Sequence, residues 1–158
     1  MPLPGAPRTN FMGLQRGEEK EKPLAPSYVT IEIRVITGNL KFRVRNVTRG
    51  TSIGDAIETA ESSAQRRTGL LKHERLNEGE GLWIIPCEAV HTFFMKFAID
   101  LIYLDRRHHV KSVVREVRPW RFSACLSAHS ILELPTGTID RSQTQKGDEL
   151  ELAPANSS

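Results

Sequence analysis

The segment CEAVHTFFMKFAIDLIYLD, residues 87–105, is a long apolar run in a chain that is otherwise polar. Two opposite charges, Lys96 and Asp100, lie inside it. A charged side chain that leaves water without a partner is strongly destabilising, so buried charges are usually paired, hydrogen-bonded or functional. The segment therefore marks the centre of the fold and the first place to search for a site.

Short strands are predicted on both sides of this segment. Residues 28–36 alternate between apolar and polar side chains, which is typical of a half-buried strand. Residues 40–44 alternate in the same way after a turn signal at 37–39, so the two strands are expected to form a β-hairpin. Further extended segments or strands are expected at 55–59, 82–85, 91–96, 99–105, 110–117, 130–134 and 149–152.

One short helix interrupts the strands. Ser62 and Gln65 have the spacing of a capping box, which predicts a helix from residue 62 to about residue 72. Turn signals recur about every ten residues along the rest of the chain. This pattern favours a mainly β fold, a compact β-sandwich or small barrel of about eight to ten short strands with one helix.

The length of 158 residues fits one domain with its own core. Residues 1–27 hold five of the nine prolines and a run of charges at 18–22, which predicts a disordered tail. We therefore expect a single β-rich domain at 28–153, and a short C-terminal tail at 154–158.

The charge pattern argues against nucleic-acid binding. The net charge is +3, but Lys and Arg are scattered among nearly as many Asp and Glu, without a dense basic run.

No apolar run approaches the ~20 residues of a membrane span. The N-terminus lacks the basic start and apolar stretch of a secretory signal, so a cytoplasmic location is expected.

Two cysteine–histidine pairs have the same spacing, Cys87 with His91 and Cys125 with His129. Together they would supply a tetrahedral zinc site. Four residues of strand span about 13 Å, however, so one metal would require the chain to bend. A Cys87–Cys125 disulfide would require an oxidising compartment. Two ordinary buried thiols are the favoured interpretation, and no cofactor is expected.

Three charged residues are further candidates. A turn at 97–98 would bring Lys96 and Asp100 together, so that Lys96 binds an anionic ligand and Asp100 orients it, or so that the two form a structural ion pair. Glu133 lies among apolar residues of an expected strand. It is a rim carboxylate, a partner for Lys96 or Arg67, or a solvated position on a half-buried strand, and the last is favoured.

Several short motifs follow one another in a specific order: RTGLL (67–71), GLW (81–83), HTFFMK (91–96), IDLIYLD (99–105), ILELP (131–135) and GD (147–148). In this order they resemble the domain of unknown function 192 family, over about residues 30–153. The chain departs from the family pattern at Phe97, where an Asn often follows the Lys, and at 105–108, where a glycine is missing from the turn.

The resemblance implies a compact, mainly β domain in a family of uncharacterised bacterial and archaeal proteins, many of them exported, with no settled activity. By family position it marks candidates for a shared polar patch, namely Arg67, His91, Lys96, Asp100 and Glu133.

We expect a non-enzymatic binding or accessory domain whose patch around His91, Lys96 and Asp100 holds a small polar or anionic ligand or a peptide. One alternative is a metal-assisted or hydrolytic enzyme that uses His91, Asp100 and Cys87, and another is a purely structural polar cluster. An enzyme requires His91 and a carboxylate within hydrogen-bond reach on the floor of a pocket, whereas a binding domain requires only a patch.

Overall fold

The computed structural model describes residues 40–155, except for the side chains of Ser63 and Arg67. The strand predicted at 28–36, its hairpin and the tail predicted at 1–27 lie outside the described residues, as do residues 156–158.

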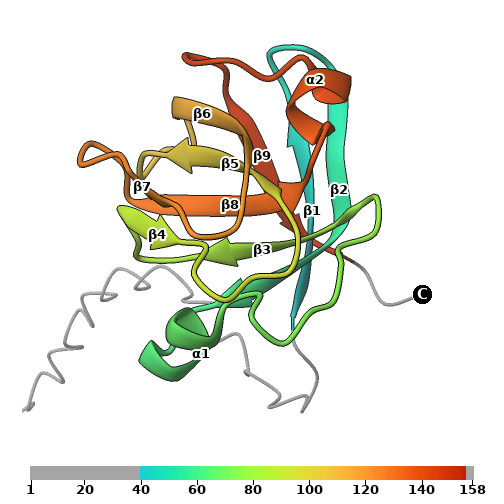
Figure 1. The fold of residues 1–158 in the computed structure, drawn as a ribbon. Helices are drawn as coiled ribbons and strands as arrows, with labels where there is room; N and C mark the ends of the chain where they lie inside the picture. Colours follow the sequence, from blue (N-terminus) through green and yellow to red (C-terminus); the bar gives the residue numbers. More distant parts are fainter. Residues whose placement is uncertain (1–39, 156–158) are drawn as a thin grey trace, which may run out of the picture. The chain divides into compact units, whose positions relative to one another are not determined.

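The described part is mainly β, as predicted, and Figure 1 shows its strands and two short helices. In chain order these are β1 (Lys41–Asn46), β2 (Thr51–Ala60), α1 (Ser63–Thr68), β3 (Glu80–Ile84), β4 (Ala89–His91), β5 (Ile99–Leu104), β6 (Val110–Val117), β7 (Phe122–Ala124), β8 (Ser130–Pro135), α2 (Thr138–Ser142) and β9 (Leu150–Pro154). The sequence did not predict α2 or β7.

Seven strands form one sheet in the order β6-β5-β8-β3-β2-β1-β9, and β4 pairs with β7 in a separate two-stranded ribbon. β2 and β3 are parallel, and the other neighbours are antiparallel. A bridge between His109 and Glu149 links the two edge strands at one end. The N–H of Val110 also donates to the Asp148 carbonyl at 2.8 Å. The sheet therefore curls into a small half-open barrel (Figure 1).

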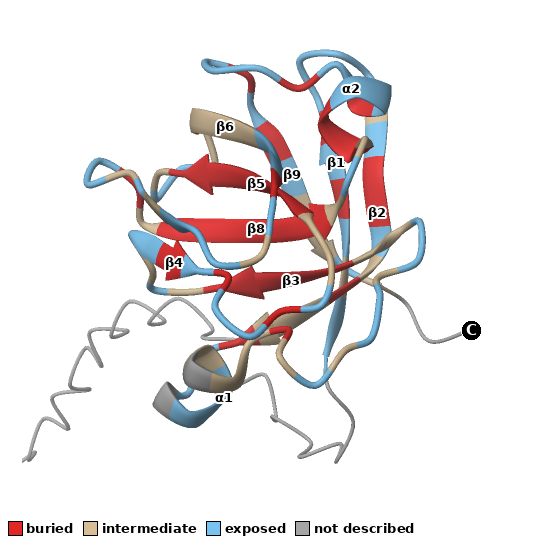
Figure 2. Ribbon diagram, viewed as in Figure 1, coloured by how far each residue is buried: buried red, intermediate tan, exposed pale blue. Residues whose placement is uncertain are grey.

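β5 lies at the centre of the fold, and all six of its residues are buried. Leu101 and Tyr103 belong to one apolar cluster, and Ile102 and Leu104 belong to the other. Alternate side chains of a strand point to opposite faces, so β5 contributes to the core on both sides of the sheet. Figure 2 shows similar burial along the neighbouring strand β8 and along β3, which lies on the other side of β8. The prediction that 87–105 marks the centre is confirmed for its second half.

The first half of that segment differs from the prediction. The strand expected at 91–96 is wrong, because β4 ends at His91 and a loop follows. Thr92 anchors this loop to the segment before β7: its N–H donates to the Arg121 carbonyl at 2.9 Å, and its hydroxyl donates to the Arg118 carbonyl at 2.7 Å. Phe94 has a left-handed backbone, with φ of 66°, which ends any extended conformation.

The capping box at the start of α1 is confirmed. The N–H of Gln65 donates to the Ser62 hydroxyl at 3.1 Å, and the N–H of Ser62 donates to the Gln65 side-chain oxygen at 3.0 Å. The helix ends earlier than predicted because Gly69, with φ of 45°, closes it by donating to the Gln65 carbonyl at 2.8 Å. The chain then turns back toward β8.

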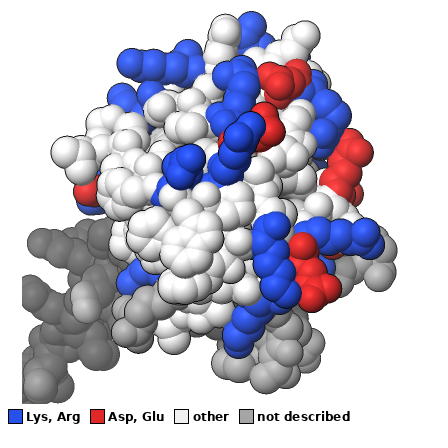
Figure 3. Space-filling view, in the orientation of Figure 1, with Lys and Arg blue, Asp and Glu red and all other residues white. Residues whose placement is uncertain are grey.

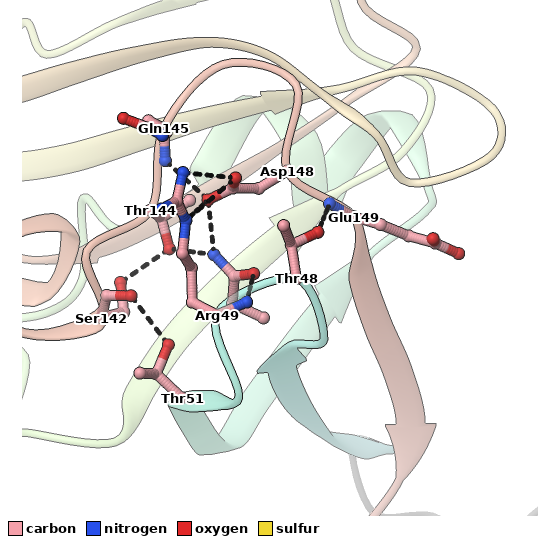
Figure 4. Close-up of polar contacts among 9 residues, drawn as sticks. Thr48, Arg49, Thr51, Ser142, Thr144, Gln145, Asp148 and Glu149 are labelled. Carbon is pink, nitrogen blue, oxygen red and sulfur yellow. Dashed lines mark hydrogen bonds and ion pairs between the residues drawn. The ribbon is translucent and has the colours of Figure 1, made fainter.

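A polar network lies where the two edges of the sheet meet (Figure 4). The buried carboxylate of Asp148 accepts hydrogen bonds from Asn46 at 2.9 Å, from Arg49 at 3.1 Å and from the N–H of Gln145 at 3.0 Å. Burial alone would raise the pKa of Asp148, but the hydrogen bonds from Arg49, Asn46 and Gln145 outweigh it and lower that pKa. The network therefore fixes the turn between β1 and β2 against the chain that leads into β9.

Candidate functional site

A cavity of about 90 Å³ lies between the end of α1, the segment 87–91 and β8. Its walls combine apolar and polar side chains, and the charged and polar ones are Arg66, Thr68, Cys87, His91 and Glu133. The guanidinium of Arg66 donates to the backbone carbonyls of Glu61 and Ile85, so it braces the wall of the cavity.

Glu133 is the buried acid of this cavity. It lies in the middle of β8, opposite Leu82 of β3 and Leu101 of β5, and only 4% of its surface is exposed. Its Oε2 atom has no hydrogen-bond partner within the described residues. Burial raises the pKa of Glu133 from 4.5 to about 7. The expectation of a solvated position is therefore wrong, because β8 is a central strand that is covered on both faces.

Gly69 forms part of the wall beside this carboxyl group. A Cβ atom built at Gly69 would lie 4.0 Å from the Glu133 Oε2 atom. The absence of a side chain at this position, which the left-handed φ also favours, leaves space beside the carboxyl group. The sequence motif RTGLL contained this glycine, but only the fold shows that it faces Glu133.

His91 lies at the rim. It is the last residue of β4, is exposed, and stacks on Phe93 with ring centroids 5.0 Å apart. His91 and Glu133 are thus two predicted candidates that line the same cavity. Arg67 is in α1 between two lining residues, but its own side chain lies outside the described structure. The sequence did not single out Arg66 or Thr68, which line the cavity.

Lys96 and Asp100 do not form the predicted pair. Lys96 is exposed, and its Nζ atom bonds an equally exposed Glu74 carboxylate at 3.1 Å. Asp100 is buried and accepts the N–H groups of Glu116 at 2.9 Å and Ile139 at 3.0 Å. Its carboxylate thus connects β5 with β6 and α2. Neither residue lines the cavity beside Glu133.

The two cysteines are free and half-buried. The Cys87 thiol donates to the Ala89 carbonyl at 3.1 Å, and burial raises the pKa of Cys87, which disfavours a reactive thiolate. The Cys125 sulfur lies 3.4 Å from the Ser127 hydroxyl. Within residues 40–155, no group of three or more His, Cys, Asp and Glu side chains is placed to hold a metal ion, so the four predicted ligands do not form one cluster.

The cavity places one buried carboxyl group beside apolar side chains. A carboxyl group with a pKa near 7 can accept a hydrogen bond or a proton from whatever enters the cavity. The neighbouring apolar walls would hold an apolar stem.

Among the described residues, no helix is both long and apolar enough to span a membrane.

The sequence matches a family model and several relatives. The model of the DUF192 family, described as "Uncharacterized ACR", matches residues 44–152. A UPF0127 protein of Thermococcus sibiricus is 33% identical over 112 residues, which cover 67% of this chain and 71% of the relative. A UPF0127 protein of Pyrococcus furiosus is 32% identical over 112 residues, which cover 67% of this chain and 94% of the relative.

Two solved structures share the fold. A protein from Sinorhizobium meliloti 1021, described as a candidate transcription regulator, has a TM-score of 0.64 and 18% identity, and the match covers 73% of this chain and 94% of that one. A protein of unknown function from Novosphingobium aromaticivorans has a TM-score of 0.59 and 21% identity, with 70% and 82% covered. At such identities the likeness shows the fold alone.

Proposed function

This chain belongs to the DUF192 family of uncharacterised proteins, and we propose that it is a non-enzymatic binding domain whose cavity holds the hydrogen-bond donor group of a small polar ligand or peptide. Glu133 would receive that group, and His91 would lie at the entrance. The binding role keeps the interpretation favoured from the sequence, but it moves the site from Lys96 and Asp100 to Glu133.

The unpartnered Oε2 atom of Glu133 carries this proposal. Buried polar atoms are nearly always hydrogen-bonded, and one that is not is destabilising by about 1–3 kcal/mol. Glu133 is buried, faces a cavity and has a raised pKa, so its present environment does not stabilise its charge. A ligand that donates an N–H or O–H group would satisfy the carboxyl group and remove this penalty.

The walls of the cavity limit the chemistry of the ligand. Leu70, Ile84 and Met95 supply apolar surface beside the carboxyl group. A volume of about 90 Å³ accommodates a head group of a few non-hydrogen atoms rather than a large cofactor. A primary ammonium on a short alkyl stem, or a neutral amide, matches this combination. An anionic head group does not, because it would face Glu133.

Two observations favour binding over the hydrolytic alternative. The Asp100 carboxylate is engaged by two backbone N–H groups away from the cavity. The Cys87 thiol has a raised pKa, opposite to that of an activated nucleophile. The raised pKa of Glu133 would also suit a general acid or base, so chemical conversion of a molecule that binds in the cavity would favour an enzyme.

An NMR titration tests the proposal. Methylammonium, butylammonium and acetamide are added in turn to the ¹⁵N-labelled full chain, and the amide of Gly69 is followed because it lies beside Glu133. We expect a saturable shift with butylammonium that strengthens as the pH rises through about 7, where Glu133 ionises. The Glu133→Gln variant should lose the response to ammonium and keep a response to acetamide.

Glu151→Gln is the matched control, because Glu151 is exposed on β9 and removing its charge leaves the cavity unchanged. This variant should titrate like the wild type. The proposal fails if none of the probes shifts Gly69 saturably, or if Glu133→Gln binds ammonium as well as the wild type. In the first case the orphaned carboxyl group would belong to a purely structural cluster.

A further inference from the structure

A set of exposed aromatic rings lies on two neighbouring loops. Phe93 and Phe94 follow β4, Trp120 lies in the segment before β7, and Phe122 is the first residue of β7; we call these four residues the aromatic patch. Their exposed fractions are 38%, 70%, 57% and 70%, respectively. Exposed large apolar side chains that cluster in this way are typical of an interaction surface.

Three of the four rings, those of Phe93, Phe94 and Trp120, pack on one another at the surface. Trp120 lies 4.7 Å from Phe94 and 5.8 Å from Phe93 between ring centroids. Thr92 ties the two loops together, because its N–H donates to the Arg121 carbonyl and its carbonyl accepts the N–H of Trp120. The patch is therefore a fixed feature of the fold. Figure 1 shows both loops on the near side of the sheet.

The backbone is strained where two of the rings are displayed. Phe94 and Trp120 have φ angles of 66° and 63°, a left-handed conformation that bulky side chains rarely adopt. Strain of this kind persists only where the surrounding structure enforces it, and it gathers at functional sites. The rings of these two strained residues contact each other edge-on. The strain therefore belongs to one feature, the display of this ring pair at the surface.

Basic side chains adjoin the patch. A hollow of about 310 Å³ between β6 and β7 is lined by Arg115, Arg118, Arg121 and Phe122, together with a single acid, Glu116. Arg115 pairs with Asp140 at 2.7 Å, whereas Arg118 and Arg121 are exposed at the edge of the patch. Figure 3 shows an uncharged area in the middle of the face that it draws, with Lys and Arg side chains around it and several Asp and Glu side chains among them.

We propose that the aromatic patch, with Arg118 and Arg121, docks the domain on the surface of a bilayer that contains anionic lipids. Trp and Phe rings partition into the interfacial region of a bilayer, where an apolar ring meets polar head groups. Arginine binds lipid phosphates through a fork of N–H donors. Charge complementarity thus selects an anionic surface over a neutral one. The proposal is independent of the ligand proposed for Glu133.

The test is sedimentation of the full chain with vesicles. One set is pure phosphatidylcholine, and the other contains equal parts of phosphatidylcholine and phosphatidylglycerol. We expect binding to the mixed vesicles, and binding to the neutral ones that is weaker on the order of tenfold. Arg118→Gln with Arg121→Gln should weaken binding to the mixed vesicles on the order of tenfold, and added salt should mimic that effect.

Phe94→Asn and Trp120→Asn each remove one ring of the patch. Asn tolerates the left-handed backbone at these two positions, so both variants should fold. Each should lower the vesicle partition on the order of tenfold. Trp120→Asn should also abolish the blue shift of tryptophan emission on binding, because Trp83 is buried and its environment stays the same.

Two control variants match these changes elsewhere on the surface. Val47→Asn removes an exposed apolar side chain from the turn after β1, and Arg43→Gln with Arg45→Gln removes two exposed charges from β1. Both should bind like the wild type. The proposal is overturned if the mixed vesicles bind no protein, or if the patch variants bind as well as these controls. It is also overturned if the free protein is a dimer in which Trp120 is already shielded, because a second copy would then occupy the patch.

Discussion

Two buried carboxyl groups in this small domain have opposite properties. Asp148 accepts hydrogen bonds from Asn46, Arg49 and Gln145, and its pKa is lowered although the group is buried. Glu133 also has little exposed surface, but its Oε2 atom has no partner within the described residues, and burial raises its pKa to about 7. Two differences separate the groups, because Glu133 lies deeper in the protein than Asp148 and does not receive the hydrogen bonds that stabilise the charge of Asp148.

The raised pKa of Glu133 predicts how stability depends on pH. The folded pKa is about 7 and the unfolded value about 4.5, so the folded state binds the extra proton between them, and stability falls as the pH rises through this window. The loss amounts to about 3 kcal/mol. The Glu133→Gln variant has no charge at position 133. Its free energy of unfolding relative to that of the wild type should therefore rise by this amount between pH 4.5 and pH 7. Urea unfolding below pH 4.5 and above pH 7 measures the change.

Glu151→Gln serves as the reference for this measurement, because Glu151 is exposed and its removal should leave the pH profile unchanged. A difference between Glu133→Gln and wild type that stays constant over the window would mean that Glu133 titrates normally. That result would also contradict the proposal that the Glu133 carboxyl group lacks a stabilising partner in the cavity.

At the scale of elements, Asp100 holds α2 in place. α2 has only five residues, and its preceding residue, Gly137, offers no side chain to cap it. Asp100 of β5 supplies the acceptor from a distance of 39 residues along the chain, and it also accepts from Glu116 of β6. One carboxylate therefore satisfies two backbone donors that would otherwise be buried without a partner.

This arrangement predicts a contrast between the two charges of the central segment. Asp100→Ala should lower the free energy of unfolding by about 2–4 kcal/mol, since two backbone N–H groups lose their acceptor. Lys96→Met should change it by less than about 1 kcal/mol, because the pair with Glu74 is exposed to solvent. Urea denaturation of the two variants measures both. Equal losses would instead indicate that Lys96 stabilises Asp100 in the folded protein.

Local patterns predicted the elements that are determined locally. The capping box of Ser62 and Gln65 located the start of α1, and apolar alternation located β6 at its observed bounds. The sequence did not predict α2, because its cap comes from a remote strand, or β7, which has only three residues. The loop after His91 was missed because the hydrogen bonds of Thr92 are made to residues 118–121.

The candidate site could be predicted only in part, for the same reason. His91 and Glu133 were identified, but the burial of Glu133 depends on β3 and β5, which pair with β8 on either side. The glycine that opens space beside Glu133 is recognisable as a motif residue, but its position opposite the carboxyl group follows from the turn after α1. Long-range pairing, which the sequence pattern does not encode, thus determines the site.

At the scale of the whole molecule, the edges of the curled sheet meet at the Asp148 network. Asp148→Asn should lower the free energy of unfolding at neutral pH by about 3 kcal/mol, because Arg49 and Asn46 lose a charged partner. A lowered folded pKa gives stability that is present above the unfolded value, ~3.9, and lost as the pH falls through the folded one. The deficit of the variant should therefore shrink in strong acid.

Urea unfolding at neutral pH and at a pH below the ordinary range of aspartate measures this change. Asp140→Asn is the comparison, because Asp140 is exposed and, among the described residues, its carboxylate bonds only the exposed Arg115. A deficit that is independent of pH would show that the network depends on shape rather than on charge.

The order of strands has a consequence for synthesis. β1 lies between β2 and β9 in the sheet. The first described strand of the chain, β1, therefore gains its second neighbour only from the last one, β9. During translation, β1 and β2 can pair as soon as both have left the ribosome, but the other edge of β1 stays bare until β9 follows. A bare edge is a template for association with another chain. The nascent protein is therefore most prone to aggregate, and most in need of a chaperone, just before its final strand emerges.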